Sequence, residues 1–147
     1  MEHEQLEAEA REEIEALHRF FVGWFSGELP QTAFESGFTA RFASDFLIIP
    51  PAGTVLGLGD LSNSIERAHG SNPEFRIAIR NVCLRRVTPS QLLVTYEEWQ
   101  RNALATTPPD NARVATVWFE RGTPLKWLHV HETTMPEALV RAGPFDF

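Results

Sequence analysis

The sequence has the length and composition of one folded domain. Of its 147 residues, 43% are hydrophobic and 22% are charged, which is typical of a globular protein and excludes a disordered one. The net charge of −7 argues against nucleic-acid binding, because neutralising phosphates requires clustered Lys and Arg. We therefore predict a single domain over residues 1–147, with a tail at 136–147 whose packing the sequence leaves open.

Targeting and membrane signals are not evident in the sequence. The N-terminus is acidic and lacks the basic segment of a secretory signal. No apolar run approaches the ~20 residues that a membrane-spanning helix needs. The single cysteine, Cys83, lies in an apolar strand-like run, which indicates a buried thiol. We expect a cytoplasmic protein that does not contact membranes.

Three helices are predicted in the first half of the chain. Over residues 5–25, apolar side chains recur at intervals of three and four and form one stripe: Leu6, Ala10, Ile14, Leu17, Phe21 and Trp24. Residues 31–42 predict a second helix, because their phenylalanines stand four residues apart. A third helix, capped by Asp60 or Ser62, is expected to end near His69.

Strands follow these helices and dominate the second half. A Pro-Pro-Ala-Gly turn separates two short strands at 46–49 and 54–58. Alternating apolar residues and turn signals then predict a long antiparallel sheet over 75–87, 92–101, 113–121 and 125–133. Segregated helices and strands indicate the α+β class. We expect a cone-shaped roll, in which three N-terminal helices cover a long curved antiparallel sheet around a cavity.

At this level the chain resembles the nuclear transport factor 2-like superfamily, also called SnoaL-like or cystatin-like. The resemblance spans residues 5–134 and is carried by the long first helix and two segments, Asp45–Gly53 (DFLIIPPAG) and Lys126–His131 (KWLHVH). The second segment, with Val117-Trp118 before it, is also similar to the association domain of calcium/calmodulin-dependent kinase two. The superfamily contains ketosteroid isomerase, scytalone dehydratase, limonene epoxide hydrolase and polyketide cyclases, and also non-enzymatic binding and dimerisation modules.

The last predicted strand carries two candidate catalytic histidines. Side chains alternate between the faces of a strand, so Trp127, His129 and His131 are expected on one face. Two imidazoles ~7 Å apart on one face can serve as acid and base or contact a ligand. The alternative is that one lies at an interface and the other bonds backbone carbonyls. No Asp or Glu completes a metal site with them, and we expect none.

Adjacent carboxylates at Glu97 and Glu98 must point to opposite faces of their strand. The resemblance favours Glu97 as the inward one, where the kinase association domain has an arginine. Glu97 is then a candidate proton acceptor opposite the histidine strand, unless Arg101 pairs with it and makes the pair structural.

The expected pocket is apolar. Its candidate walls, which are equally candidates for plain core, are Trp24, Phe38, Phe46, Trp99 and Trp118. We find no Gly-rich phosphate loop and no nucleophile elbow, so we expect no cofactor.

Two functions remain open from the sequence. The first is a small-molecule-binding domain that acts as a cofactor-free lyase, isomerase or cyclase on an apolar substrate, with Glu97, His129 and His131 as acid and base. The alternative is a non-catalytic dimerising or ligand-binding module. We also expect a homodimer through the outer sheet face. Leu92, Leu93 and Val94 are consecutive, so apolar side chains point to both faces of their strand, and both faces should be buried.

Overall fold

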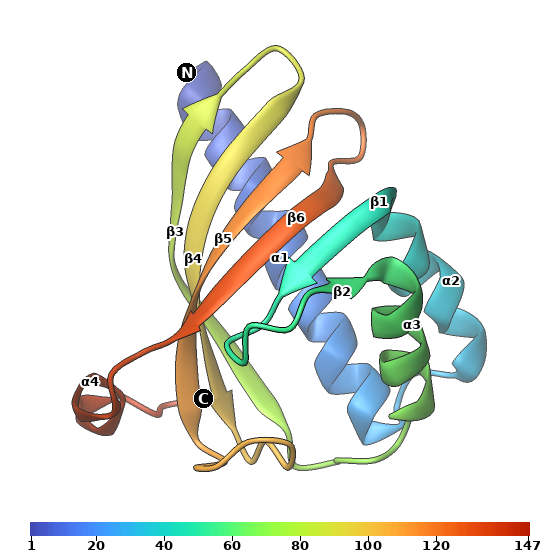
Figure 1. Cartoon of the computed structure of the whole chain (residues 1–147), viewed down its shortest axis with the longest axis vertical. Helices are drawn as coiled ribbons and strands as arrows, with labels where there is room; N and C mark the ends of the chain where they lie inside the picture. The colour runs from blue at the N-terminus through green and yellow to red at the C-terminus, as the bar shows by residue number, and fades with distance from the viewer.

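The computed structural model describes residues 1–147 and has four α-helices and six strands (Figure 1). The helices are α1 (Glu2–Ser26), α2 (Phe34–Gly37), α3 (Leu58–Arg67) and α4 (Glu137–Ala142). The strands are β1 (Phe42–Ile49), β2 (Leu56–Gly57), β3 (Arg76–Val87), β4 (Gln91–Arg101), β5 (Asn111–Glu120) and β6 (Lys126–Thr134). The predicted α+β class and the order of helices and strands are confirmed.

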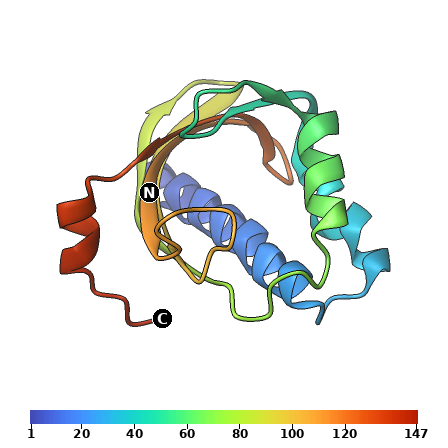
Figure 2. The same cartoon turned by 60° about the horizontal axis from the view of Figure 1, so that its bottom comes forward.

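The long first helix lies across the concave side of the sheet (Figure 2). Its apolar stripe is buried along its whole length, from Leu6 to Trp24. The helix ends where Gly27 adopts φ 83°, a conformation that glycine allows without steric cost. The indole of Trp24 donates a hydrogen bond of 2.7 Å to the carbonyl of Ile65, which joins the end of α1 to α3.

The six strands form one curved, mixed sheet in the order β2-β1-β6-β5-β4-β3. β3, β4, β5 and β6 pair antiparallel, as predicted, whereas β1 runs parallel to β6 and antiparallel to β2. The sheet bends around α1, and α2 and α3 close the side next to β1 and β2 (Figures 1 and 2). The concave face therefore encloses the space between the sheet and the helices.

The predicted second helix is present only in fragments. Residues 31–41 form two 3₁₀ turns, Gln31–Ala33 and Thr39–Arg41, on either side of the four-residue α2. The four-residue spacing of the phenylalanines nevertheless has a structural consequence. Phe34, Phe38 and Phe42 are buried in the core, where consecutive rings of this series lie 5.1 and 4.7 Å apart.

The tail packs on the outer, convex side of the sheet. Val140 of α4 and Phe145 contact Trp99 on β4, and the rings of Trp99 and Phe145 meet edge to face with centroids 5.4 Å apart. Arg80 on β3 donates to the carbonyl of Pro144. The tail thus covers part of the outer sheet face, and the rest of that face is partly exposed.

None of the helices could span a bilayer by its length and hydropathy.

Candidate functional site

A cavity of about 390 Å³ lies between the concave face of the sheet, α1 and α3. Twenty residues line it, and most of its wall is apolar: Phe21, Phe25, Ile48, Leu61, Ile65 and Phe75. The segment 103–106, which joins β4 to β5, also lines the cavity and includes the exposed Leu104. A volume of this size falls at the lower end of the range for small-molecule sites.

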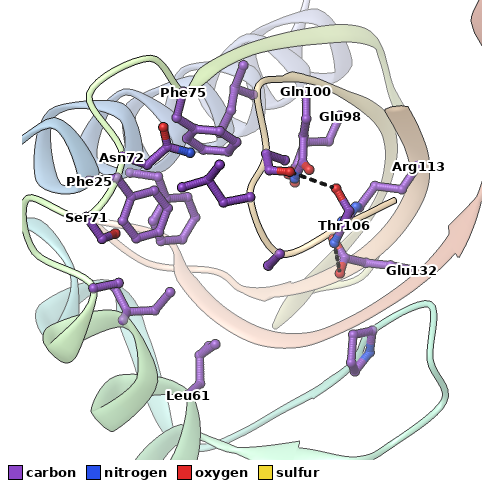
Figure 3. A pocket seen from close by; sticks show the side chains of 18 of the residues that line it. Phe25, Leu61, Ser71, Asn72, Phe75, Glu98, Gln100, Thr106, Arg113 and Glu132 are labelled. Atoms are coloured by element: carbon purple, nitrogen blue, oxygen red, sulfur yellow. Dashed lines mark hydrogen bonds and ion pairs between the residues drawn. The ribbon is translucent and has the colours of Figure 1, made fainter. Parts of the chain in front are cut away.

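One end of the cavity is polar (Figure 3). Three neighbouring strands supply the side chains: Glu98 and Gln100 from β4, Arg113 from β5 and Glu132 from β6. Arg113 is paired directly opposite Glu98 across the sheet, and its guanidinium donates to Glu132 over 3.2 Å. We call these four residues the polar floor.

Below the floor, Glu98 is bonded to a histidine from the first helix. Nε2 of His18 lies 2.9 Å from Oε1 of Glu98, and both side chains are almost fully buried. The amide of Gln100 donates to the other carboxylate oxygen of Glu98. Rings of Phe21, Tyr96 and Trp127 surround the imidazole of His18.

The surroundings give the two floor carboxyl groups opposite proton affinities. Burial opposes the charge of Glu98, but the charges of His18 and Arg113 and the hydrogen bonds outweigh it and lower the pKa of Glu98 to about 2. Burial, followed by the negative charge of Glu98, raises the pKa of Glu132 to about 7, although Arg113 and His18 act against this shift. The floor therefore holds one permanent carboxylate and one carboxyl group that exchanges its proton near neutral pH.

The pKa values of two groups near Glu98, His18 and Tyr96, are also shifted. Burial alone would lower the pKa of His18, but the charge of Glu98 and their hydrogen bond dominate and raise it. The pKa of the Tyr96 hydroxyl is raised by burial and by the two carboxylates. Tyr96 is consequently a neutral group at the pH of the cell.

The inward carboxylate of β4 is Glu98, and the prediction that Glu97 points inward is wrong. Leu92, Val94 and Tyr96 are buried in the core, so β4 turns its even-numbered residues inward. Glu97 lies on the outer face, where it accepts hydrogen bonds from Asn81 and from the indole of Trp99.

A β-bulge accounts for the placement of the histidines. On β5, Trp118 and Phe119 are consecutive, but they pair with His129 and Trp127 on β6, so Leu128 is an extra residue. The bulge leaves Trp127 inside together with Val130 and Glu132. His129 and His131 consequently face outward, opposite Trp118 and Thr116, and neither lines the cavity.

The five aromatic residues expected as cavity walls lie elsewhere. Trp24, Phe38 and Phe46 are fully buried in the main core. Trp99 is covered by the tail on the outer face, and Trp118 also lies on that face. The aromatic walls are instead Phe21, Phe25 and Phe75.

The sequence contains a signal for two residues of the site that the prediction missed, His18 and Glu98. His18 follows Ile14 by four residues and thus falls within the apolar stripe of α1. Glu98 shares strand parity with the apolar Leu92 and Val94, which places it on their buried face. No group of three or more His, Cys, Asp or Glu side chains is arranged to hold a metal ion.

No protein-family model matches the sequence, and no curated protein sequence does either. Solved structures match over most of the chain. A protein of unknown function from Pseudomonas aeruginosa, described as NTF-2 like, has a TM-score of 0.77 and 28% identity over 87% of this chain and 99% of its own. This chain has the nuclear transport factor 2-like fold. The resemblance noted from the sequence is thereby confirmed.

Two further structures with the nuclear transport factor 2-like fold show how differently it is used. A proposed dehydratase of the NTF2-like family from Streptomyces avermitilis has a TM-score of 0.68 and 16% identity over 90% of this chain and 98% of its own. The CaMKII hub of S. rosetta has a TM-score of 0.58 and 10% identity over 71% of this chain and 85% of its own. At these identities the similarity concerns the fold alone, and function has to be argued from the site.

Proposed function

We propose that the cavity binds a small, largely apolar molecule carrying an oxygen atom, and that Glu132 exchanges a proton with it without a cofactor. The observation that carries the proposal is the polar floor, where a carboxyl group with a pKa of about 7 lines an apolar cavity. A general acid or base works best when its pKa lies near the working pH. Strongly shifted ionisable groups in a cavity are typical of functional sites.

The floor also offers a place for the oxygen atom of the ligand. Arg113 lines the cavity, and its guanidinium bonds Glu132 through Nη1, which leaves Nη2 as a further donor. A carbonyl or hydroxyl oxygen of the ligand would supply an acceptor for this donor. The apolar wall, with Phe25 and Phe75, would hold the rest of the molecule.

The geometry suits a lyase or an isomerase. In its ionised form, Glu132 would take a proton from the carbon next to the carbonyl of the ligand, while Arg113 would stabilise the negative charge that forms on the oxygen. Returning the proton to another carbon completes an isomerisation, and returning it to a leaving hydroxyl group completes a dehydration. The similarity to a proposed dehydratase with this fold agrees with this choice.

The test is hydrogen exchange in small ketones. The protein is incubated with apolar ketones in D₂O, deuterium uptake is followed by mass spectrometry, and binding is measured by thermal shift. We expect wild-type protein to bind and to exchange, and Glu132→Gln to bind without exchange. A ligand at 100 times its Kd adds about 2.7 kcal/mol to the unfolding free energy.

The control variant is Glu97→Gln, which changes the neighbouring carboxylate on the outer face and should bind and exchange like wild type. Exchange that survives in Glu132→Gln would contradict the role of Glu132. Binding without exchange in the wild type would favour a non-catalytic binding module.

A second candidate function is self-association through the outer sheet face. Leu47 is 42% exposed there, in the same cross-strand row as the partly exposed Trp118 and Leu93, and such apolar surface favours a partner. One structural neighbour is named as a hub. We expect light scattering to give twice the 16.6 kDa of one chain and Leu47→Glu to halve it. A wild-type mass of one chain would contradict the dimer.

A further inference from the structure

His18 is buried and bonded at both ring nitrogens. Nδ1 lies 2.6 Å from the carbonyl oxygen of Ile14, one helical turn earlier, and a carbonyl oxygen can only accept. Nδ1 therefore carries a hydrogen. Nε2 faces Oε1 of Glu98 at 2.9 Å, and a single proton lies between these two atoms.

The surroundings of Glu98 favour the position of that proton on Nε2 of His18. Its second oxygen accepts from the side-chain amide of Gln100. Both protonation states satisfy these two hydrogen bonds, but the guanidinium of Arg113, paired opposite Glu98, favours the charged carboxylate over the neutral carboxyl group. The arrangement thus favours an imidazolium at His18 and a carboxylate at Glu98, a charge-assisted pair in buried surroundings.

The titratable groups on the floor side of His18 come from three strands. They are Glu98 and the Tyr96 hydroxyl on β4, Arg113 on β5 and Glu132 on β6. On α1 itself, Glu13 accepts a hydrogen bond from the indole of Trp127 and is paired with Arg41 at 2.7 Å. Glu15 and Arg19 of α1 and Arg76 of β3 line a second pocket together with His18. Two cations and two carboxyl groups therefore share the region of the polar floor.

Without His18, the two carboxyl groups would share one cation. Arg113 is paired across the sheet with Glu98 and bonded to Glu132, so it does not by itself decide which of them keeps a proton. Two interacting carboxyl groups of this kind titrate as a pair. Of the two carboxyl groups, His18 is bonded to Glu98 alone, and it is not part of the lining of this cavity.

We propose that His18 is a positioning residue that confines the exchangeable proton of the polar floor to Glu132, by bonding Glu98 as a permanent carboxylate. The inference deepens the proposed function and rests on it for its catalytic meaning. It assigns different tasks to two chemically identical side chains. Glu98 supplies a fixed negative charge, and Glu132 carries the proton that reaches the ligand.

The experiment is a carboxyl ¹³C NMR titration of the ligand-free protein, with the two signals assigned from Glu98→Gln and Glu132→Gln. In the wild type we expect the Glu132 signal to complete its transition near neutral pH while the Glu98 signal stays constant from pH 8 to 4. In His18→Gln, which keeps a hydrogen-bond donor but removes the charge, both signals should move over the same pH interval. The upper apparent pKa of the pair should rise by ~1 unit or more, because a nearby cation is lost.

The matched control is His69→Gln, since His69 also bonds a backbone carbonyl, that of Leu29, but does not contact the floor. It should titrate like the wild type. If His18→Gln does not fold, His18→Ala at a lower temperature gives the same comparison. Independent transitions of Glu98 and Glu132 in either His18 variant would overturn the proposal.

The same measurement separates this inference from the proposed function, because it uses no ligand. A shared titration in His18→Gln together with a cavity that binds no ketone would refute the function and keep the role of His18. Binding and exchange with an unchanged titration in His18→Gln would keep the function and refute the role of His18.

Discussion

Two adjacent glutamates on opposite faces of β4 have very different surroundings. Glu98 is buried, bonded to a histidine and paired across the sheet with an arginine. Glu97, one residue earlier, lies on the outer face and bonds neutral donors, Asn81 and the indole of Trp99. A buried charge is unfavourable unless an opposite charge or hydrogen bonds compensate it, so a buried carboxylate needs such partners. The inner face is therefore where a side chain's proton affinity is set by its neighbours.

The comparison predicts unequal costs for the same substitution. Glu98→Ala should lower the unfolding free energy by about 3–5 kcal/mol, because it leaves the buried charge of His18 without its partner. Glu97→Ala should cost about 1 kcal/mol, the usual value of a hydrogen bond near the surface. Urea denaturation of both variants measures the difference. Equal losses would show that the two faces do not differ in this way.

The pH dependence of stability should distinguish the two carboxyl groups of the inner face, Glu132 and Glu98. The pKa of Glu132 is about 7 in the folded protein, against 4.5 as its ordinary value. Between these values the folded protein holds a proton that the unfolded chain has lost, so stability falls as pH rises. Relative to Glu132→Gln, the wild type should lose up to about 3 kcal/mol from pH 4.5 to 7. A difference between the two proteins that stays constant with pH would contradict the raised pKa.

For Glu98 we expect the pH dependence of stability to have the opposite sign. Its folded pKa of about 2 lies below the ordinary value of 4.5, so its contribution is complete above pH 4.5 and is lost as the pH falls toward 2. Compared with Glu98→Gln, the wild type should lose its advantage only in this acid range. Acid unfolding followed by circular dichroism measures it. An advantage that vanishes near neutral pH instead would assign the permanent charge to the wrong residue.

The smallest effect is expected on the outer face, under the tail. Phe145→Ala should cost about 1 kcal/mol, because one edge-to-face contact with Trp99 is lost while the sheet beneath keeps its pairing. Chemical denaturation is again the measurement, with Leu139→Ala, at an exposed position of α4, as the control. A cost comparable with that of Glu98→Ala would mean that the tail is part of the core.

The fold was predictable because its signals are repeated along the chain. The stripe of α1 has six members, and the alternation of β3 to β6 extends over many residues, so single exceptions do not hide the pattern. The second helix was overestimated because Phe34, Phe38 and Phe42 satisfy helical spacing while the backbone between them changes to 3₁₀ turns.

The site was less predictable because it depends on single residues. Strand parity around Leu92 and Val94 favours Glu98, but the comparison with a related family favoured Glu97, and that choice exchanged the faces. The histidines could not be placed by alternation, since nothing in the segment Lys126–His131 reveals the extra residue at Leu128. His18 is a lone polar residue on an apolar helix face, and its partner is 80 positions away.

The bulge at Leu128 has an evolutionary consequence. If β6 kept all its residues but paired without this bulge, strict alternation from Trp127 onward would turn His129 and His131 toward the cavity and Glu132 away from it. An imidazole surface would then replace the carboxyl group that lines the floor. Proteins that share this scaffold can thus differ in their cavity chemistry through the gain or loss of a single β-bulge, with no change in the side chains themselves.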